Sequence, residues 1–361
     1  MQPRIPDAEL PGSVPAASAL PERPSVQVVH AIRRAGKVPA FWVFVAEIVL
    51  AVVFGIASPH HAFLSFDNFS SIGLNSTELI LLATGGTFML AAGELDLSVA
   101  SNLVLSSVIA AGIIVRVSGT PSQVAAGSYP NEGVAVVLGV LGGLLAGAMF
   151  GLVNGLLVTR LKVSSFVVTL GTMGIGTGLG LLVTNGVDVV GLPSSLQDDF
   201  GANAVWGVPI PLVVSILVIG GGWLVSGQTR FGLHVLAYGS SRDAARRAGL
   251  RSTRIVCYVF ILSGLMAGAA GVFDITRFGT TALSGHSTDT LAAIAAVVIG
   301  GTSLFGGRAS MGGTLVASFL PVELVSGLVM LNVGPFYQNI AIGLILIVAV
   351  YLDQRRRASV G

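Results

Sequence analysis

Long apolar segments, separated by short polar ones, occupy most of this chain and restrict what it can fold into. Hydrophobic residues make up 53% of its 361 residues and charged residues only 10%, whereas soluble domains carry roughly 25% charged residues. A helix that crosses a bilayer needs about 20 mostly apolar residues. The sequence therefore predicts an all-α polytopic membrane protein.

Ten apolar segments are long enough, or nearly so, to span the membrane. They are 41–58, 72–92, 99–117, 134–158, 166–184, 209–226, 255–274, 291–304, 312–331 and 336–352. The segment 291–304 is too short for a simple span. We expect it to be broken or re-entrant.

The basic residues predict the orientation of these spans, because Lys and Arg concentrate in cytoplasmic loops. With the N-terminus inside, 17 of the 19 Lys and Arg residues fall on the inner side, the exceptions being Arg116 and Arg277. Losing one span would invert every later loop. We therefore expect about ten transmembrane helices with both termini cytoplasmic.

The net charge of +2 is small, and nothing in the sequence implies nucleic acid.

Composition divides the chain into three parts. Residues 1–38 are rich in proline and poor in aromatics, so we expect a disordered cytoplasmic tail and not a cleaved signal peptide. Residues 39–354 form the predicted transmembrane domain, with a cytoplasmic loop at 227–254, and 355–361 form a basic cytoplasmic C-terminus. The single cysteine, Cys257, excludes an intramolecular disulfide and a thiolate-rich metal site.

Glycine spacing predicts a close helix contact. Five glycines of the fourth span recur every four residues, at Gly139, Gly143, Gly147, Gly151 and Gly155. They form one face, which another helix is expected to approach closely. The glycines of 171–180 are less regular, and we expect local unwinding there.

The loop 227–254 contains an arginine-rich island at 237–254 that cannot cross a membrane. A short helix is expected within it, with Ser240 or Ser241 as the N-cap and Gly249 at its end. Asp243 would lie near the positive end of this helix and Arg246 and Arg247 near the negative end. The alternative is a solvated basic loop that only fixes topology.

Two further features bear on what this loop does. Ala244 and Ala248 lie four residues apart on the expected helix, on a small, smooth face that another protein's groove could accept. The chain itself lacks the GxxxxGK[ST] phosphate loop, because Ala31 precedes the only Gly-Lys pair at the glycine position. Any energy from ATP must therefore come from a partner.

The sequence resembles the ribose-type, monosaccharide permease subunits of bacterial ATP-binding-cassette importers. The resemblance is carried by AGELDLSVAS (92–101), NGLLVTRLKVSSFVVTLGTM (154–173), AYGSSRDAARRAGLRSTRI (237–255) and IAAVVIGGTSLFGG (294–307). It covers roughly residues 41–353. Departures are Asp289, Thr290, Leu291 and Ala292 in place of a more acidic pattern, and Ala100 and Ala309 at glycine positions.

This resemblance implies a type II-like importer permease that works as a dimer of identical or different chains. It implies cytoplasmic ATPase subunits that bind ATP and Mg²⁺, and a periplasmic or extracellular substrate-binding protein. The chain would be a transport subunit in the lipid bilayer of the inner membrane, and neither an enzyme nor the holder of a cofactor. The family's coupling loop corresponds to 239–249, so the expected ATPase contacts are Ser241, Arg242, Asp243, Ala244, Ala245 and Gly249.

Intramembrane carboxylates are the basis of an alternative function. Glu47, Glu78 and Glu323 lie within predicted spans, where charge is costly, and no Lys or Arg accompanies them in the sequence. They could serve a proton-coupled secondary transporter. Asp96, with Glu94, is expected at the cytoplasmic end of the second span, where it either caps the next helix or contacts a partner.

Uncharged polar residues within the spans are candidates for the path of a monosaccharide or related polyol, moved by alternating access. The candidates are Asn75, Asn102, Asn154, Thr169, Thr172 and Asn332. Hydrogen bonds between helices explain each of them equally well. The histidines show no metal-ligand spacing, so no metal site is expected. An intramembrane hydrolase would need Ser284 and His286 to face each other.

Overall fold

The structure is a computed structural model that describes residues 39–358. The predicted tail at 1–38 and the last residues of the basic C-terminus, 359–361, lie outside the described residues.

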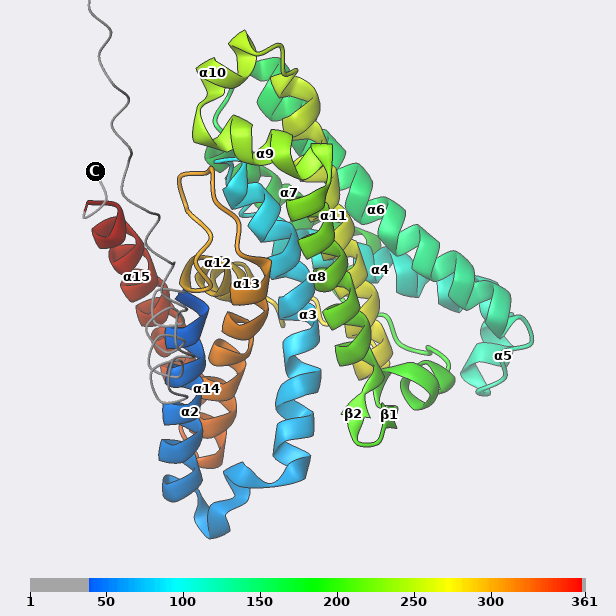
Figure 1. The fold of residues 1–361 in the computed structure, drawn as a ribbon. Coiled ribbons are helices and arrows are strands. Elements are labelled where there is room, and N and C mark those ends of the chain that lie inside the picture. Colours follow the sequence, from blue (N-terminus) through cyan, green and yellow to red (C-terminus); the bar gives the residue numbers. More distant parts are fainter. Residues whose placement is uncertain (1–38, 359–361) are drawn as a thin grey trace, which may run out of the picture. The chain divides into compact units, whose positions relative to one another are not determined.

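Helices account for nearly all regular structure in the described chain (Figure 1). Their bounds are α2 Pro39–Ala57, η1 Pro59–Leu64, α3 Phe66–Ala91, α4 Val99–Ser118, α5 Pro121–Ala125, α6 Glu132–Leu161, α7 Ser165–Thr184, η2 Leu196–Gly201, α8 Ile210–Gln228, α9 Arg230–Ser240, α10 Arg242–Arg247, α11 Ser252–Phe278, α12 Asp289–Ile299, α13 Met311–Ala317, α14 Phe319–Met330 and α15 Pro335–Ala358. The strands β1 (Ala204–Val205) and β2 (Val208–Pro209) form one short antiparallel hairpin. The all-α prediction is confirmed at this level.

Seven helical stretches in residues 39–358 are long and apolar enough to cross a membrane. The seventh, Met311–Met330, is interrupted between α13 and α14. Pro321 explains the break, because its nitrogen cannot donate to the carbonyl of Ala317 one turn earlier. The expectation that 291–304 is not a simple span is confirmed, since α12 has 11 residues.

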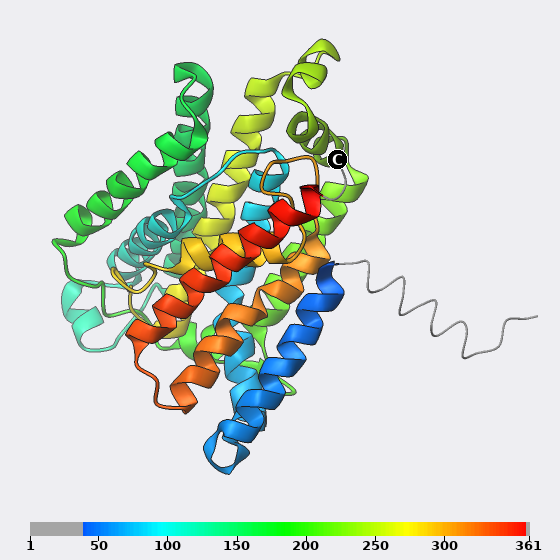
Figure 2. The ribbon, with the colours of Figure 1, turned by 90° about the vertical axis from the view of Figure 1, so that its left-hand side faces the viewer.

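Helix α11 is the centre of the transmembrane part. It packs against α3, α4 and α6, while α2, α14 and α15 lie together on the other side of α3 and α12 (Figure 2). Apolar clusters fill the contacts, with Phe88, Val259 and Phe260 in one and Leu82 and Leu103 in another, all at most 2% exposed.

The predicted glycine face of α6 is confirmed, and its partner is α11. A Cβ on Gly151 would collide with the carbonyl of Phe260, and one on Gly147 with the carbonyl of Gly264. A Cβ on Gly264 would likewise collide with the carbonyl of Gly147. The two backbones therefore touch over several turns, which fixes the central helix pair.

The unwinding expected near 171–180 is wrong. Helix α7 is continuous from Ser165 to Thr184. Gly176 and Gly180 face α4, whereas a Cβ on Gly171, Gly174 or Gly178 would meet nothing within 4 Å. Glycine costs an interior helix position about 1 kcal/mol, which a membrane helix with no competing water tolerates.

Candidate coupling site and solute path

Helices α9 and α10 project at one end of the molecule, opposite the β1–β2 hairpin (Figure 1). Ser241 is the N-cap of α10, since its hydroxyl accepts a hydrogen bond from the nitrogen of Ala244 at 3.3 Å. Gly249 ends the turn with a left-handed φ of 82°, a conformation that suits glycine. The short capped helix expected from the sequence is therefore present.

Five of the six residues expected to contact an ATPase are exposed: Ser241, Arg242, Asp243, Ala244 and Gly249. Ala245 differs, because it is 4% exposed and packs in the cluster that contains Tyr238 and Ile255. It holds α10 against the bundle and offers no outer surface. Ala244 and Ala248, one turn apart, are both exposed.

Helix α10 is tied to the turn that follows α3. Arg242 Nη2 donates to Glu94 Oε1 at 2.8 Å and to the carbonyl of Gly93 at 2.9 Å. The Tyr238 hydroxyl donates to the same Glu94 oxygen at 3.4 Å, and burial raises the pKa of Tyr238, so the hydroxyl keeps its proton. Gly307 N donates to the carbonyl of Ala91 at 2.9 Å. The loop after α12 is therefore also bonded to the end of α3.

Residues 93–98 form an extended connection from this turn into the bundle, here named the 93–98 segment. Asp96 lies in it and is 7% exposed. Its Oδ1 accepts from the nitrogen and hydroxyl of Ser98 at 3.0 and 2.6 Å, and its Oδ2 accepts from Ser263 of α11 at 3.0 Å. Asp96 therefore holds Ser98, the residue before α4, and ties it to α11, although α4 itself has no side-chain cap.

The other bonds of the 93–98 segment reach three more helices. Asn154 of α6 donates to the Ser98 hydroxyl at 2.9 Å, and Ser165 of α7 accepts from Leu95 N at 3.1 Å. Thr290 of α12 donates to the Leu97 carbonyl at 3.4 Å. Hydrogen bonds therefore connect α10, through the 93–98 segment, to α4, α6, α7, α11 and α12, so a displacement of α10 can be passed to these helices.

Most of the residues predicted to line the solute path instead form hydrogen bonds within a helix or between helices. Asn102 donates to the Gly147 carbonyl of α6 at 3.2 Å, and Thr169 and Thr172 donate to carbonyls of their own helix. Asn332 is exposed in the loop after α14. Of the six candidates, only Asn75 lines a cavity described below.

The intramembrane carboxylates divide into two groups. Glu47 of α2 and Glu323 of α14 interact electrostatically, and Glu47 Oε1 has no hydrogen-bond partner within residues 39–358. Glu78 of α3 lies 3.5 Å from Arg277 of α11. The expectation that no arginine accompanies these carboxylates is therefore wrong for Glu78. The partner is 199 positions away, so sequence proximity could not reveal it.

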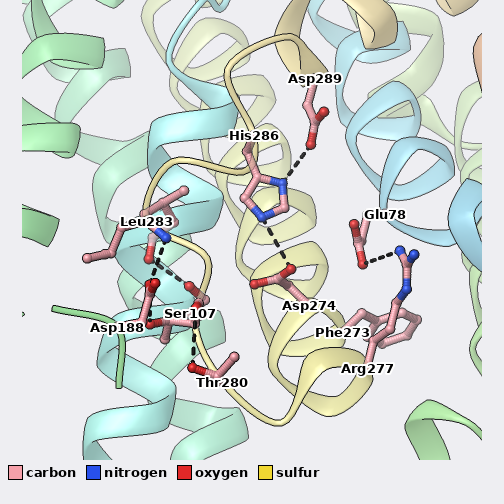
Figure 3. Close-up of polar contacts among 12 residues, drawn as sticks. Glu78, Ser107, Asp188, Phe273, Asp274, Arg277, Thr280, Leu283, His286 and Asp289 are labelled. Carbon is pink, nitrogen blue, oxygen red and sulfur yellow. Dashed lines mark hydrogen bonds and ion pairs between the residues drawn. The ribbon is translucent and has the colours of Figure 1, made fainter. Parts of the chain in front are cut away.

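Arg277 belongs to a larger group of charges, the cavity cluster, which the sequence reasoning missed (Figure 3). Its members are Glu78, Asp274, Arg277, His286 and Asp289. The ring of His286 lies between two carboxylates, with Nδ1 2.7 Å from Asp289 Oδ2 and Nε2 3.2 Å from Asp274 Oδ1. The second contact is an ion pair without good hydrogen-bond alignment.

The contacts of His286 limit what its ring can do. Both ring nitrogens face carboxylate oxygens, Nδ1 that of Asp289 and Nε2 that of Asp274. Neither nitrogen is free to take a proton from Ser284, as the hydrolase alternative would require.

The same contacts bear on metal binding. Glu78, Asp274 and His286 place ligand-type atoms within 4.8 Å of one another. However, Arg277 already pairs with Glu78 and Asp289 already occupies one nitrogen of His286. The donor set is therefore poorly matched to a cation, and the absence of a metal site stays a prediction.

Two cavities border the cavity cluster. One, of about 400 Å³, lies between α3, α12, α14 and α15 and is lined by Asn75, Glu78 and Asp289 among others. The second, of about 740 Å³, lies between α4, α7 and the loop before α12, and His286 and Asp188 line it. The His286–Asp289 pair therefore joins a wall of one cavity to a wall of the other.

Comparison with known proteins places these features in context. Residues 68–350 match the family model described as the permease component of branched-chain amino acid transport systems. The chain is 36% identical to the L-arabinose ABC transporter permease protein AraH of Azospirillum brasilense, over 95% of this chain and 94% of that protein. It is 34% identical to the ribose import permease protein RbsC of Bacillus subtilis, over 87% and 92%.

A third relative is the D-allose transport system permease protein AlsC of Escherichia coli, 31% identical over 86% of this chain and 91% of that protein. No solved structure matches the chain with comparable significance.

Proposed function

The chain belongs to the family of branched-chain amino acid transport system permease components, and from that premise we propose that it moves a monosaccharide or related polyol by alternating access, driven by separate ATPase subunits. As a member of the family it is a multi-pass inner-membrane transport subunit. The observation that carries the solute class is its similarity, over at least 86% of its length, to permeases named for arabinose, ribose and allose.

The proposed topology has ten membrane passages and both termini in the cytoplasm, in a type II-like arrangement. Figure 1 supports it, because α2 begins and α15 ends toward the side of α10. The passages beyond the seven apolar stretches would be α3, α15 and the connection 279–310 that contains α12. Arg160, Arg230 and Arg308 then join the basic residues of α10 on the cytoplasmic side, as such residues prefer.

The proposed partners follow from two surfaces and from the mechanism. Helix α10, with its exposed Ala244 and Ala248, would sit in a groove of an ATPase subunit that binds ATP and Mg²⁺. The open glycines Gly171, Gly174 and Gly178 of α7 would face a second permease chain, identical or different, because small residues favour helix contacts in lipid. A substrate-binding protein would deliver solute at the hairpin end.

The proposed mechanism uses the bonded route described above. ATPase closure would displace α10, and the Arg242–Glu94 ion pair would pass this movement to the 93–98 segment. Thr290 ties that segment to the first turn of α12, next to Asp289 of the cavity cluster. A shift at the cytoplasmic end would thus alter the walls of both cavities, which is what alternating access requires.

The test is purification of tagged protein from native membranes in mild detergents, with mass spectrometry of what accompanies it. We expect an ATPase to co-purify with the wild type and with the control Trp206→Glu, which places a charge on a 97% exposed side chain at the opposite end. We expect it to be lost with Ala244→Glu. Equal recovery with Ala244→Glu would contradict the α10 contact.

Failure to recover any ATPase would contradict the proposed driving force. Uptake that an uncoupler abolishes at constant ATP would then favour the proton-coupled alternative. The specific observation behind that alternative is the buried Oε1 of Glu47, which has no hydrogen-bond partner among residues 39–358 and interacts electrostatically with Glu323.

A further inference from the structure

The cavity of about 400 Å³ has the size of a small-molecule site. Pockets that enclose small ligands measure roughly 300–1,000 Å³. Helix α3 and three helices from the C-terminal part of the chain, α12, α14 and α15, form its walls, and Glu78 and Asp289 of the cavity cluster form its charged side (Figure 3).

The polar wall of this cavity suits hydroxyl groups. Glu78 and Asp289 supply carboxylate oxygens, and Asn75 and Gln338 supply amides. A sugar hydroxyl both donates and accepts, so it matches carboxylates, which accept, and amides, which do both. Hydrogen bonds to a charged acceptor are about twice as strong as those between neutral groups.

Much of the remaining lining is apolar. It includes Leu79 of α3, Val325 of α14 and Ile342 of α15. The ring carbons of a pyranose or furanose would pack here while its hydroxyls face Glu78 and Asp289. Convergent polar groups on an otherwise apolar surface are typical of small-molecule sites.

The charges behind the wall indicate a neutral ligand. Arg277 lies 3.5 Å from Glu78 Oε1, and His286 lies 2.7 Å from Asp289 Oδ2. Each cavity carboxylate therefore already faces a basic side chain, and a cationic ligand would compete with both. A neutral polyol needs only acceptors, which these pairs still provide.

We propose that this cavity is a binding site for a neutral, polyhydroxylated solute, with Glu78 and Asp289 as hydroxyl acceptors. The proposal rests on the proposed function, that the chain moves sugars. The site adjoins the larger cavity across the His286–Asp289 pair, so solute at Asp289 sits beside a movable wall.

The first experiment measures uptake in cells that carry the complete transporter, with L-arabinose, D-ribose and D-allose as probes and L-leucine as the contrasting solute. Glu78→Gln and Asp289→Asn are each expected to raise KM about tenfold for the sugar that the wild type transports, since each weakens a charged hydrogen bond. The matched control, Asp67→Asn, removes an exposed carboxylate of the same helix α3 and should leave KM unchanged.

A second experiment does not depend on these variants folding. In a Cys257→Ala background, Gln338→Cys places a thiol in the cavity wall, and Phe336→Cys places one at an 80% exposed position. The transported sugar is expected to slow labelling of the first thiol by a membrane-impermeant reagent at least threefold, and of the second not at all.

The outcomes distinguish a failure of the proposed binding site from a failure of the proposed function. Sugar uptake by the wild type, with unchanged KM in both carboxylate variants and no protection of the cavity thiol, would overturn the site alone. A wild type that takes up L-leucine and none of the sugars would overturn both. Raised KM with a protected thiol would establish the site.

Discussion

The 93–98 segment and the cavity cluster are both polar and buried, but they are built differently. Around the 93–98 segment most bonds are neutral or involve one charge, and they join five helices with nearly every group satisfied. In the cavity cluster, three carboxylates share two cations beside two cavities. The dense hydrogen bonding of the 93–98 segment resists deformation and suits the transmission of movement. The cavity cluster leaves carboxylate oxygens next to the cavities, where they can accept hydrogen bonds from a passing solute.

The largest expected effect is at Asp96. Asp96→Ala would leave Ser98 and Ser263 without their acceptor in a buried site, and we expect the free energy of unfolding to fall by about 3 kcal/mol. Thermal unfolding in detergent would measure it. Asp289→Ala, at the edge of a cavity, should cost clearly less, and equal losses at the two sites would erase the contrast.

The next effect is on coupling and not on stability. Arg242→Glu should reduce solute uptake at least tenfold, because α10 loses its tie to Glu94. The Arg242 end of the pair is 50% exposed and the Glu94 end only 4%, so water screens the pair from one side, and Tm should fall by less than in Asp96→Ala. Restored uptake in the Glu94→Arg/Arg242→Glu double variant would confirm the pair, and a large fall in Tm would assign it to stability instead.

A smaller effect is at His286. Its ring lies between the carboxylates of Asp274 and Asp289, and His286→Ala would leave these two carboxylates without the donor that links them. We expect Tm in detergent to fall by about 2–6 °C. His286→Gln keeps a donor at this place and should lose less, so an equal loss in the two variants would contradict this origin.

The smallest effect is at Asp243, in the first turn of α10. Asp243→Asn removes a favourable interaction with the helix dipole of about 0.3–1 kcal/mol, and the site is exposed. Tm should therefore change by no more than about 2 °C. A change as large as that of Asp96→Ala would mean that α10 carries much of the stability of the bundle.

Local sequence patterns predicted what depends on local interactions. Apolar length located the seven spanning stretches found in residues 39–358, the four-residue glycine spacing located the α6 contact, and Ser241 with Gly249 bounded α10. Residues whose role depends on a distant partner were not predicted. Arg277 and Glu78 meet only after α3 and α11 have packed, and Asn102 and Asn154 bond between helices although they suited a polar path equally well.

Two features of the structure could not be read from the sequence. Ala245, which the family resemblance placed at the ATPase contact, is buried, and α7, which its irregular glycine spacing suggested would unwind, is continuous. The direction in which a residue points depends on how its helix is rotated against its neighbours. For a six-residue helix such as α10, too few positions exist for a periodic pattern to predict that rotation.

The shortness of α12 has an electrical consequence. Eleven helical residues extend about 16 Å, roughly half of the 30 Å hydrocarbon thickness. A helix of this length cannot by itself seal the membrane against ions, so the seal depends on the helices packed around it, α3, α13 and α15. A neutral solute crosses without electrical work, whereas an ion is driven by the membrane voltage, so these helices must exclude ions while the solute moves.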